Sequence, residues 1–254
     1  MGSATLPSMT VYVKAGADGR RPGACPFSQA VYMSALAAEA AGLVTCGEPV
    51  PVLVSRPPTE FAQHGLKHVP AVVCGGVALD NADDIAAYMR EAFPGAGLAY
   101  NCPEAELATA GVFSRFCFYM KAVSRDPSHL EAELRKLDAF LAAAPGPFLC
   151  GARLSQLDCE VMPKLQHLRV ACAALKGYTI GVELAHFWRY MHQAYSEEAF
   201  VRACPCDQEI VLHWADRPET DKLSFERHKA LSREKPKYSL DVPVRAAVVT
   251  LVDD

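Results

Sequence analysis

The stretch GACPFSQAVYMSALAAEAAGL, residues 23–43, determines how the first part of the chain is interpreted. Its third residue, Cys25, is followed by a proline, and the stretch carries no charged side chain as far as Ala38. Apolar residues recur near helical spacing from Phe27 to Leu43, and alanine and methionine favour helices, so we expect a helix that ends near Gly42. The stretch fits either a catalytic thiol on a soluble helix or the first part of a membrane segment.

The composition of the chain is that of a globular protein. Its 254 residues, 51% hydrophobic and 21% charged, supply enough apolar material for two compact domains. A net charge of −4 and the lack of lysine–arginine runs argue against a nucleic-acid partner. The N-terminus lacks the pattern of a signal peptide, so we expect a cytoplasmic protein. The ten cysteines are scattered, which predicts mostly reduced thiols, and their spacing does not support a metal site.

Short β-like segments flank the predicted helix. VYVK at 11–14 precedes it, VPVLVS at 50–55 predicts a second strand, and VPAVVCGGVAL at 69–79 predicts two strands around a Gly-Gly turn. NADDIAAYMREAF at 81–93 then carries helix signals. The order β-α-β followed by β-β-α is typical of a thioredoxin-like domain.

Strand signals nearly vanish after this domain, and helical patterns dominate. We therefore predict an α/β N-terminal thioredoxin-like domain followed by an all-α C-terminal domain. Two stretches suggest where the domains end. One is a connector that contains glycine and proline, and the other is the charged, proline-rich end of the chain. These are a thioredoxin-like domain at 10–92, a linker at 93–102, a helical domain at 103–216 and an extended tail at 217–254.

Two helix starts are predicted in the helical domain. Ser128 to Glu131 and Ser155 to Asp158 both have the spacing of a capping box, and the second helix should end at Gly177. The tail closes with the apolar run AAVVTLV, for which docking on the body of the protein is one expectation.

Cys25 is the candidate reactive residue. A cysteine just before a helix has its sulfur near unpaired N–H groups and the positive end of the helix dipole, which favours the thiolate. Pro26 suits the first helical position. Position 28 is a serine, so a mixed disulfide at Cys25 needs a second thiol from elsewhere, and glutathione is the obvious donor. A merely buried cysteine is the alternative.

Four stretches carry a resemblance to a known family: VYVKAGADG, GACPFSQ, LDCEVMPKLQHLRV and FWRYMHQAYSEEAFVRACPCDQEI. In order and spacing, from about residue 10 to residue 216, the chain resembles the chloride intracellular channel family. The resemblance implies a glutathione transferase-like fold of two domains, with a glutaredoxin-like first domain. The short loop AAAPGP and the extended tail are most similar to invertebrate members.

The resemblance also implies a glutathione site. It would contain Cys25, Pro26 and Phe27, together with Val69 and Pro70, whose peptide bond is cis in this fold; a trans turn proline is the alternative. An acidic position that meets the γ-glutamyl amine falls on Asp80 or Asn81, and either residue could instead cap the following helix.

Three functions remain open at this point. The resemblance implies a chloride intracellular channel-like protein, with a monothiol glutathione site in a soluble, reduced form that is monomeric. It further implies redox- or pH-dependent insertion of a segment at about 25–54 into a bilayer, with chloride or anion channel activity. Glu39, Glu48 and two prolines interrupt that segment, so a buried helix explains it better. The alternatives are a glutathione-dependent oxidoreductase of the glutaredoxin or dehydroascorbate reductase type, or a scaffold without catalytic activity.

Overall fold

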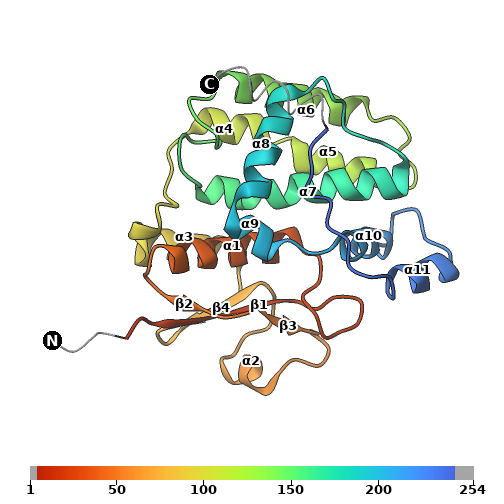
Figure 1. Cartoon of the computed structure of the whole chain (residues 1–254). Coiled ribbons are helices and arrows are strands. Elements are labelled where there is room, and N and C mark those ends of the chain that lie inside the picture. The colour runs from red at the N-terminus through yellow and green to blue at the C-terminus, as the bar shows by residue number, and fades with distance from the viewer. Residues whose placement is uncertain (1–4, 244–254) are drawn as a thin grey trace.

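The N-terminal part of the chain is built on a mixed five-stranded sheet (Figure 1). The computed structural model describes residues 5–243. β1 is the central strand, parallel to β2 and β3 and antiparallel to β4, which pairs with β5. The strands are β1 (Ser8–Lys14), β2 (Thr45–Cys46), β3 (Val50–Val52), β4 (Ala71–Cys74) and β5 (Val77–Leu79).

Three helices accompany this sheet: α1 (Pro26–Ala40), α2 (Thr59–Gln63) and α3 (Ala82–Ala92). α1 and α3 cover one face and α2 lies on the other (Figure 1). The predicted order of strands and helices is present, and the domain is thioredoxin-like. β2 and α2 are additional elements, of two and five residues, which are too short to produce a recognisable periodicity.

The remainder of the described chain is helical, as predicted. A short 3₁₀ turn, η1 (Pro94–Ala96), connects the two parts. The helices that follow are α4 (Pro103–Thr109), α5 (Val112–Tyr119), α6 (Ser128–Ala143), α7 (Gln156–Lys176), α8 (Ala185–Ser196), α9 (Glu198–Ala203), α10 (Asp207–Ala215) and α11 (Phe225–Leu231). The protein therefore combines a thioredoxin-like N-terminal part with an all-α C-terminal part.

Of the two predicted capping boxes, only the second forms. Ser155 and Asp158 cap α7 reciprocally, and Gly177 ends that helix in the left-handed conformation. α6 begins one residue earlier than predicted, so Ser128 is its first helical residue rather than its cap. The N–H and the hydroxyl of Ser128 instead donate to Asp126 at 3.0 and 2.7 Å.

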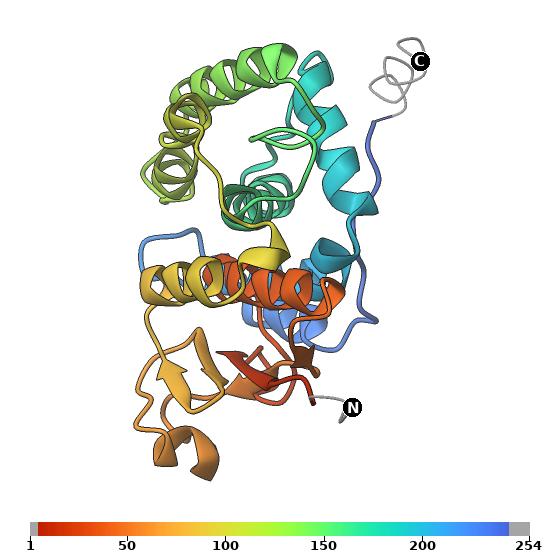
Figure 2. The ribbon, with the colours of Figure 1, turned by 90° about the vertical axis from the view of Figure 1, so that its left-hand side faces the viewer.

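α1 is buried on most of its sides. Figure 2 shows it between the sheet and the helical part, where it packs against β1, α3, α7 and α9. Eleven of its fifteen residues are buried, and the Ser34 hydroxyl donates to the Gln156 side chain of α7 at 3.1 Å. This burial explains why the stretch up to Ala38 has no charge. None of the helices among residues 5–243 has the length and hydropathy needed to cross a bilayer.

The segment after residue 216 is not extended throughout. α11 interrupts it, because the Ser224 side chain accepts the Arg227 N–H at 3.2 Å and Leu231 is buried. Beyond α11, residues 235–241 run as a strap over α10 and α7. The apolar run predicted to dock, residues 246–252, lies outside the described part of the chain.

Candidate thiol site

Cys25 lies at the start of α1. It is the N-cap residue, with extended backbone angles, and its carbonyl accepts the Gln29 N–H at 2.9 Å. The side chain is half-buried, and Pro26 occupies the first helical position as predicted. The thiol is thus held beside the unpaired N–H groups of a helix that is itself anchored by burial.

The thiol lines an open depression of about 480 Å³. Three loops meet there, one before α1, one before β4 and one before α3. The lining residues are Cys25, Phe27, His68, Val69, Pro70, Asp80, Asn81 and Ala82. Of the predicted glutathione-site residues, only Pro26 is not among them, since it is buried in the first turn of α1. The peptide bond between Val69 and Pro70 is cis.

Asp80 and Asn81 have different structural roles. The Asp80 carboxylate accepts the N–H groups of Lys67 and His68 at 2.7 and 3.0 Å, so it fixes the loop that leads to Val69. These hydrogen bonds hold the pKa of Asp80 below its usual value. The Asn81 side chain accepts two N–H groups of α3 and caps that helix.

His68 is a member of this depression to which the sequence assigned no role. Its Nδ1 lies 3.5 Å from the Asp80 carboxylate, and its side chain is largely exposed. The chain offers no motif around His68, and only the folding of the two loops brings it to the thiol side of the sheet.

The residue at position 28, one helical turn after Cys25, is a serine in the first turn of α1. Ser28 is buried, and its hydroxyl accepts a long hydrogen bond of 3.4 Å from the Lys14 N–H. A cysteine is therefore absent from the position that would resolve a disulfide at Cys25 within the same turn.

At Phe27 the depression adjoins a cluster of side chains from the helical part, which was not predicted. The Phe27 ring packs edge-on against Phe113 of α5, with centroids 5.9 Å apart. The Lys164 ammonium of α7 lies 5.7 and 5.6 Å from the two ring centres, and burial lowers the pKa of Lys164. Phe113 and Lys164 also line a cavity of about 280 Å³ between α4, α5 and α7. These contacts join residues far apart in sequence, so no local pattern indicates them.

The chain is similar to proteins named as chloride intracellular channels. The chloride intracellular channel Clic of Drosophila melanogaster is 31% identical over 248 residues, which cover 94% of this chain and 91% of that protein. The chloride intracellular channel exl-1 of Caenorhabditis elegans is 29% identical over 241 residues, which cover 93% of this chain and all of that protein. No family model matches the chain.

Solved structures share the fold. The crystal structure of the CLIC homologue EXC-4 from C. elegans superimposes with a TM-score of 0.86 at 24% identity, over 98% of both chains. Dehydroascorbate reductase of Chlamydomonas reinhardtii gives a TM-score of 0.70 at 21% identity, over 82% of this chain and 97% of that one. Glutathione transferase Omega 1C of Trametes versicolor gives a TM-score of 0.62 at 18% identity, over 88% of this chain and 98% of that one, so the fold is glutathione transferase-like. The identity and coverage of the Drosophila relative show that the chain belongs to the chloride intracellular channel family.

Proposed function

We propose that this member of the family is a glutathione-dependent thiol oxidoreductase with Cys25 as its nucleophile. The observation that carries the proposal is the depression in which Cys25, Phe27, Val69, Pro70, Asp80 and Asn81 meet. A half-buried thiol at a helix start, facing an open site, has the surroundings of a reactive cysteine rather than of a core residue.

Glutathione fits this depression as a short extended peptide. Among residues 5–243, the backbone of Val69 makes no hydrogen bond, so its N–H and C=O are free to pair with the tripeptide. The γ-glutamyl end would approach the loop that Asp80 and Asn81 support, and the cysteinyl sulfur would lie at Cys25. The cavity shared by Phe113 and Lys164 would then receive the second substrate.

The chemistry is thiol–disulfide exchange in two steps. The Cys25 thiolate attacks the glutathione sulfur of a mixed disulfide; a new S–S bond forms to glutathione, and the substrate leaves as a thiolate that takes a proton. A second glutathione thiolate then attacks the glutathione sulfur bound to Cys25. Glutathione disulfide leaves, and the Cys25 thiolate is regenerated. The first glutathione entered when its thiolate attacked the substrate disulfide and released one substrate thiol, so two glutathione molecules supply the two electrons.

Cys25→Ser tests the proposal directly. With hydroxyethyl disulfide and glutathione as substrates, we expect turnover to fall to the uncatalysed rate, because a serine hydroxyl is not ionised at neutral pH. Mass spectrometry of the wild type after oxidised glutathione should find an adduct on Cys25. Cys102→Ser, which removes another half-buried thiol, is the matched control and should leave turnover intact. Undiminished turnover in Cys25→Ser would refute the proposal.

A second candidate function is an anion channel in a bilayer. The names of the two curated relatives, matched over nearly their full lengths, favour it. The segment at 25–54 would have to enter the membrane, and α1 would first have to leave its buried position and break the ion pair of Glu39 with Arg202 at 3.1 Å.

Flotation with anionic and neutral vesicles, at neutral and acidic pH and with and without oxidant, tests this candidate. Co-flotation together with chloride conductance would support it. Absence of both under every condition would leave the thiol reaction as the function.

A further inference from the structure

Cys102 and Cys150 are neighbouring thiols that lie outside the Cys25 depression. Cys102 is the last residue before α4, and Cys150 lies in the turn between α6 and α7. The Cys102 Sγ atom is 4.0 Å from the carbonyl oxygen of Leu149, the residue next to Cys150 in the chain. Burial raises the pKa of Cys150 to about 11, and the Cys102 thiol, within hydrogen-bonding reach of it, adds to this rise. The two sulfur atoms are therefore side by side.

Spacing and exposure distinguish this pair from Cys46 and Cys74. Those two thiols are buried, and they lie on β2 and β4, on opposite sides of β1, where each is paired with Met9. Two strand spacings separate their Cα atoms by about 10 Å, which is more than the ~7 Å that a disulfide spans. Cys102 and Cys150 are both half-buried, so a small disulfide in solution reaches them.

The turn that carries Cys150 is firmly held. The backbones of Phe148 and Gly151 exchange two hydrogen bonds, at 3.1 and 3.3 Å. Between them, the Leu149 N–H donates to the buried Asp158 carboxylate of α7 at 2.9 Å. Cys150 is thus a fixed thiol, and the approach of the two sulfurs to bonding distance falls to the side of Cys102.

The segment that leads to Cys102 is held less firmly. Residues 97–102 connect η1 to α4, and the Leu98 carbonyl accepts the Gln156 N–H at 2.9 Å. Within residues 5–243, the backbone of residues 99–101 makes no hydrogen bond to another backbone group. Because these residues end at Cys102, a covalent bond from its sulfur would fix the loose end of the segment.

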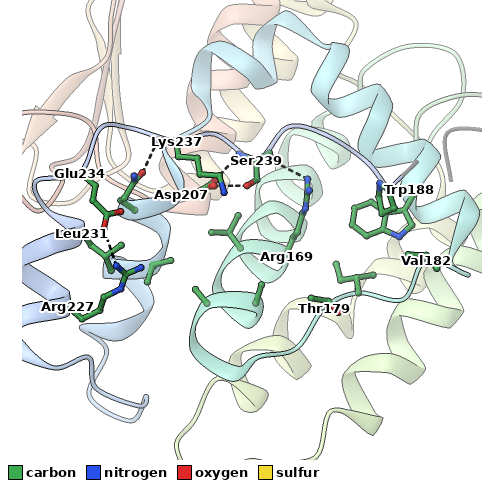
Figure 3. A pocket seen from close by; sticks show the side chains of 17 residues that line it. Arg169, Thr179, Val182, Trp188, Asp207, Arg227, Leu231, Glu234, Lys237 and Ser239 are labelled. Atoms are coloured by element: carbon green, nitrogen blue, oxygen red, sulfur yellow. Dashed lines mark hydrogen bonds and ion pairs between the residues drawn. The ribbon is translucent and has the colours of Figure 1, made fainter. Parts of the chain in front are cut away.

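A second irregular segment that contacts α7 shows the contrast. In the strap at 235–241, the N–H and hydroxyl of Ser239 donate to the Asp207 carboxylate at 3.1 and 2.7 Å, and its carbonyl accepts from Arg169 at 3.0 Å (Figure 3). The strap is thus attached through charged groups, and it contains no cysteine. It therefore serves as an internal reference for the connecting segment 97–102.

We propose that Cys102 and Cys150 are a redox-active pair, which glutathione disulfide oxidises to a disulfide that anchors the connecting segment to the helical part. The thiolate of one cysteine attacks glutathione disulfide; an S–S bond to glutathione forms, and one glutathione thiolate leaves and takes a proton. The other cysteine loses its proton and attacks the protein sulfur of this mixed disulfide, and the second glutathione leaves. The protein gives up two electrons and two protons, and one glutathione disulfide becomes two glutathione molecules.

The disulfide would make the protein more resistant to unfolding. It closes a loop of about 50 residues, which contains α4, α5 and α6, and so restricts the unfolded chain. It also joins the end of the connecting segment to the fixed turn before α7. Oxidation of this pair therefore tightens the molecule, and it leaves Cys25 out of the reaction.

Peptide mapping in glutathione buffers tests the proposal on the full-length protein. A Cys25→Ser background removes the glutathione adduct expected at Cys25, so the result is independent of the proposed thiol reaction. After alkylation of free thiols and digestion without reductant, we expect peptides linked through Cys102 and Cys150 when glutathione disulfide is added, and their loss when glutathione is restored. Glutathione adducts on both cysteines without linked peptides, or two free thiols at every buffer ratio, would overturn the proposal.

Thermal unfolding and hydrogen exchange test the anchor. We expect the Tm of the oxidised protein in this background to exceed that of the reduced protein by about 5 °C or more. Adding Cys150→Ser should abolish the difference, whereas adding Cys206→Ser, which removes another half-buried thiol, should preserve it. Oxidation should slow hydrogen exchange at residues 99–102 and leave the strap unchanged. An equal Tm in both redox states, or a difference that persists in Cys150→Ser, would contradict the proposal.

Discussion

At the scale of single residues, the character of the thiol site depends on the contrast between positions 25 and 28. Cys25 faces the depression, whereas Ser28 turns inward and contacts the backbone of β1 through the Lys14 N–H. A one-turn helix spacing brings both side chains to the same end of α1. Because position 28 is a serine and not a cysteine, a mixed disulfide at Cys25 has no second thiol in the same helical turn to resolve it.

Ser28→Cys should convert this site into a dithiol one. We expect a disulfide between positions 25 and 28 after mild oxidation, because a thiolate at Cys25 then has an intramolecular partner. Thiol titration before and after oxidation, with peptide mapping, measures it. Cys25→Ser combined with Ser28→Cys is the control and should retain its thiols. If Ser28→Cys alone also keeps both thiols reduced under oxidised glutathione, the proximity argument is wrong.

Asp80 gives the loop before Val69 its pH dependence. Since its pKa is depressed in the folded protein, the carboxylate contributes stability above its unfolded value of about 3.9, and this contribution disappears as the pH falls through the folded pKa. We expect the Lys67 and His68 amides to exchange faster with solvent in Asp80→Ala at neutral pH, and in the wild type only under acid conditions. Hydrogen exchange with mass spectrometry measures this. Asp83→Ala, on the exposed first turn of α3, should not alter the loop.

At the scale of elements, the start of α7 shows why the capping box predicted at Ser155 forms and the one predicted at Ser128 does not. Asp158 is fully buried and accepts from the Leu149 N–H, from the N–H and hydroxyl of Ser155, and from the Tyr190 hydroxyl. Burial still outweighs these donors and raises the pKa of Asp158. The helix start is thus a polar network inside the core, whereas the start of α6 is exposed.

Ser155→Ala should therefore destabilise the protein far more than Ser128→Ala. Losing the cap and one donor to a buried carboxylate costs about 1–2 kcal/mol, or a fall of roughly 2–8 °C in Tm, whereas Ser128→Ala should change the free energy of unfolding by less than about 0.5 kcal/mol. Thermal unfolding of both variants measures the difference. Similar values for the two would mean that the network around Asp158 adds no stability.

The sequence predicts those elements whose residues show a clear hydrophobic periodicity, a turn motif or a capping motif. α1, α3, β4, β5 and the end of α7 at Gly177 follow from periodicity, turn chemistry and capping. β2 and α2 are too short to give such a signal. A serine followed three residues later by an acidic residue occurs at both 128 and 155, and this spacing alone does not show that only Ser155 caps a helix. What separates them is burial, which the chain acquires only when Asp158 meets Tyr190 of α8.

At the scale of the whole molecule, the contacts of Phe27 with Phe113 and Lys164 depend on how the two parts pack together. Cys25 and its loops follow from local patterns and a family resemblance, but these contacts require α5 and α7 to meet α1. No spacing in the sequence encodes that meeting. The position of Cys25 is consequently predictable, and the cluster of Phe27, Phe113 and Lys164 beside it is not.

Lys164 should favour negatively charged substrates. In Lys164→Leu, we expect kcat/KM for anionic dithiodiglycolate to fall about tenfold relative to neutral hydroxyethyl disulfide, since one partly buried charge contact is lost. Because burial lowers the pKa of Lys164, the wild-type preference should fade as the pH rises, earlier than for an exposed lysine. Lys136→Leu on α6 is the control. A ratio that is unchanged in Lys164→Leu would remove Lys164 from substrate selection.

The burial of α1 also bears on how the chain folds as it is made. α1 leaves the ribosome before α7 and α9, which cover much of its surface and are synthesised more than a hundred residues later. The nascent thioredoxin-like part must therefore wait with an apolar helix uncovered, and its final packing couples distant segments, a topology that slows folding and invites chaperones. Release of α1 from the finished protein would expose the same apolar surface again.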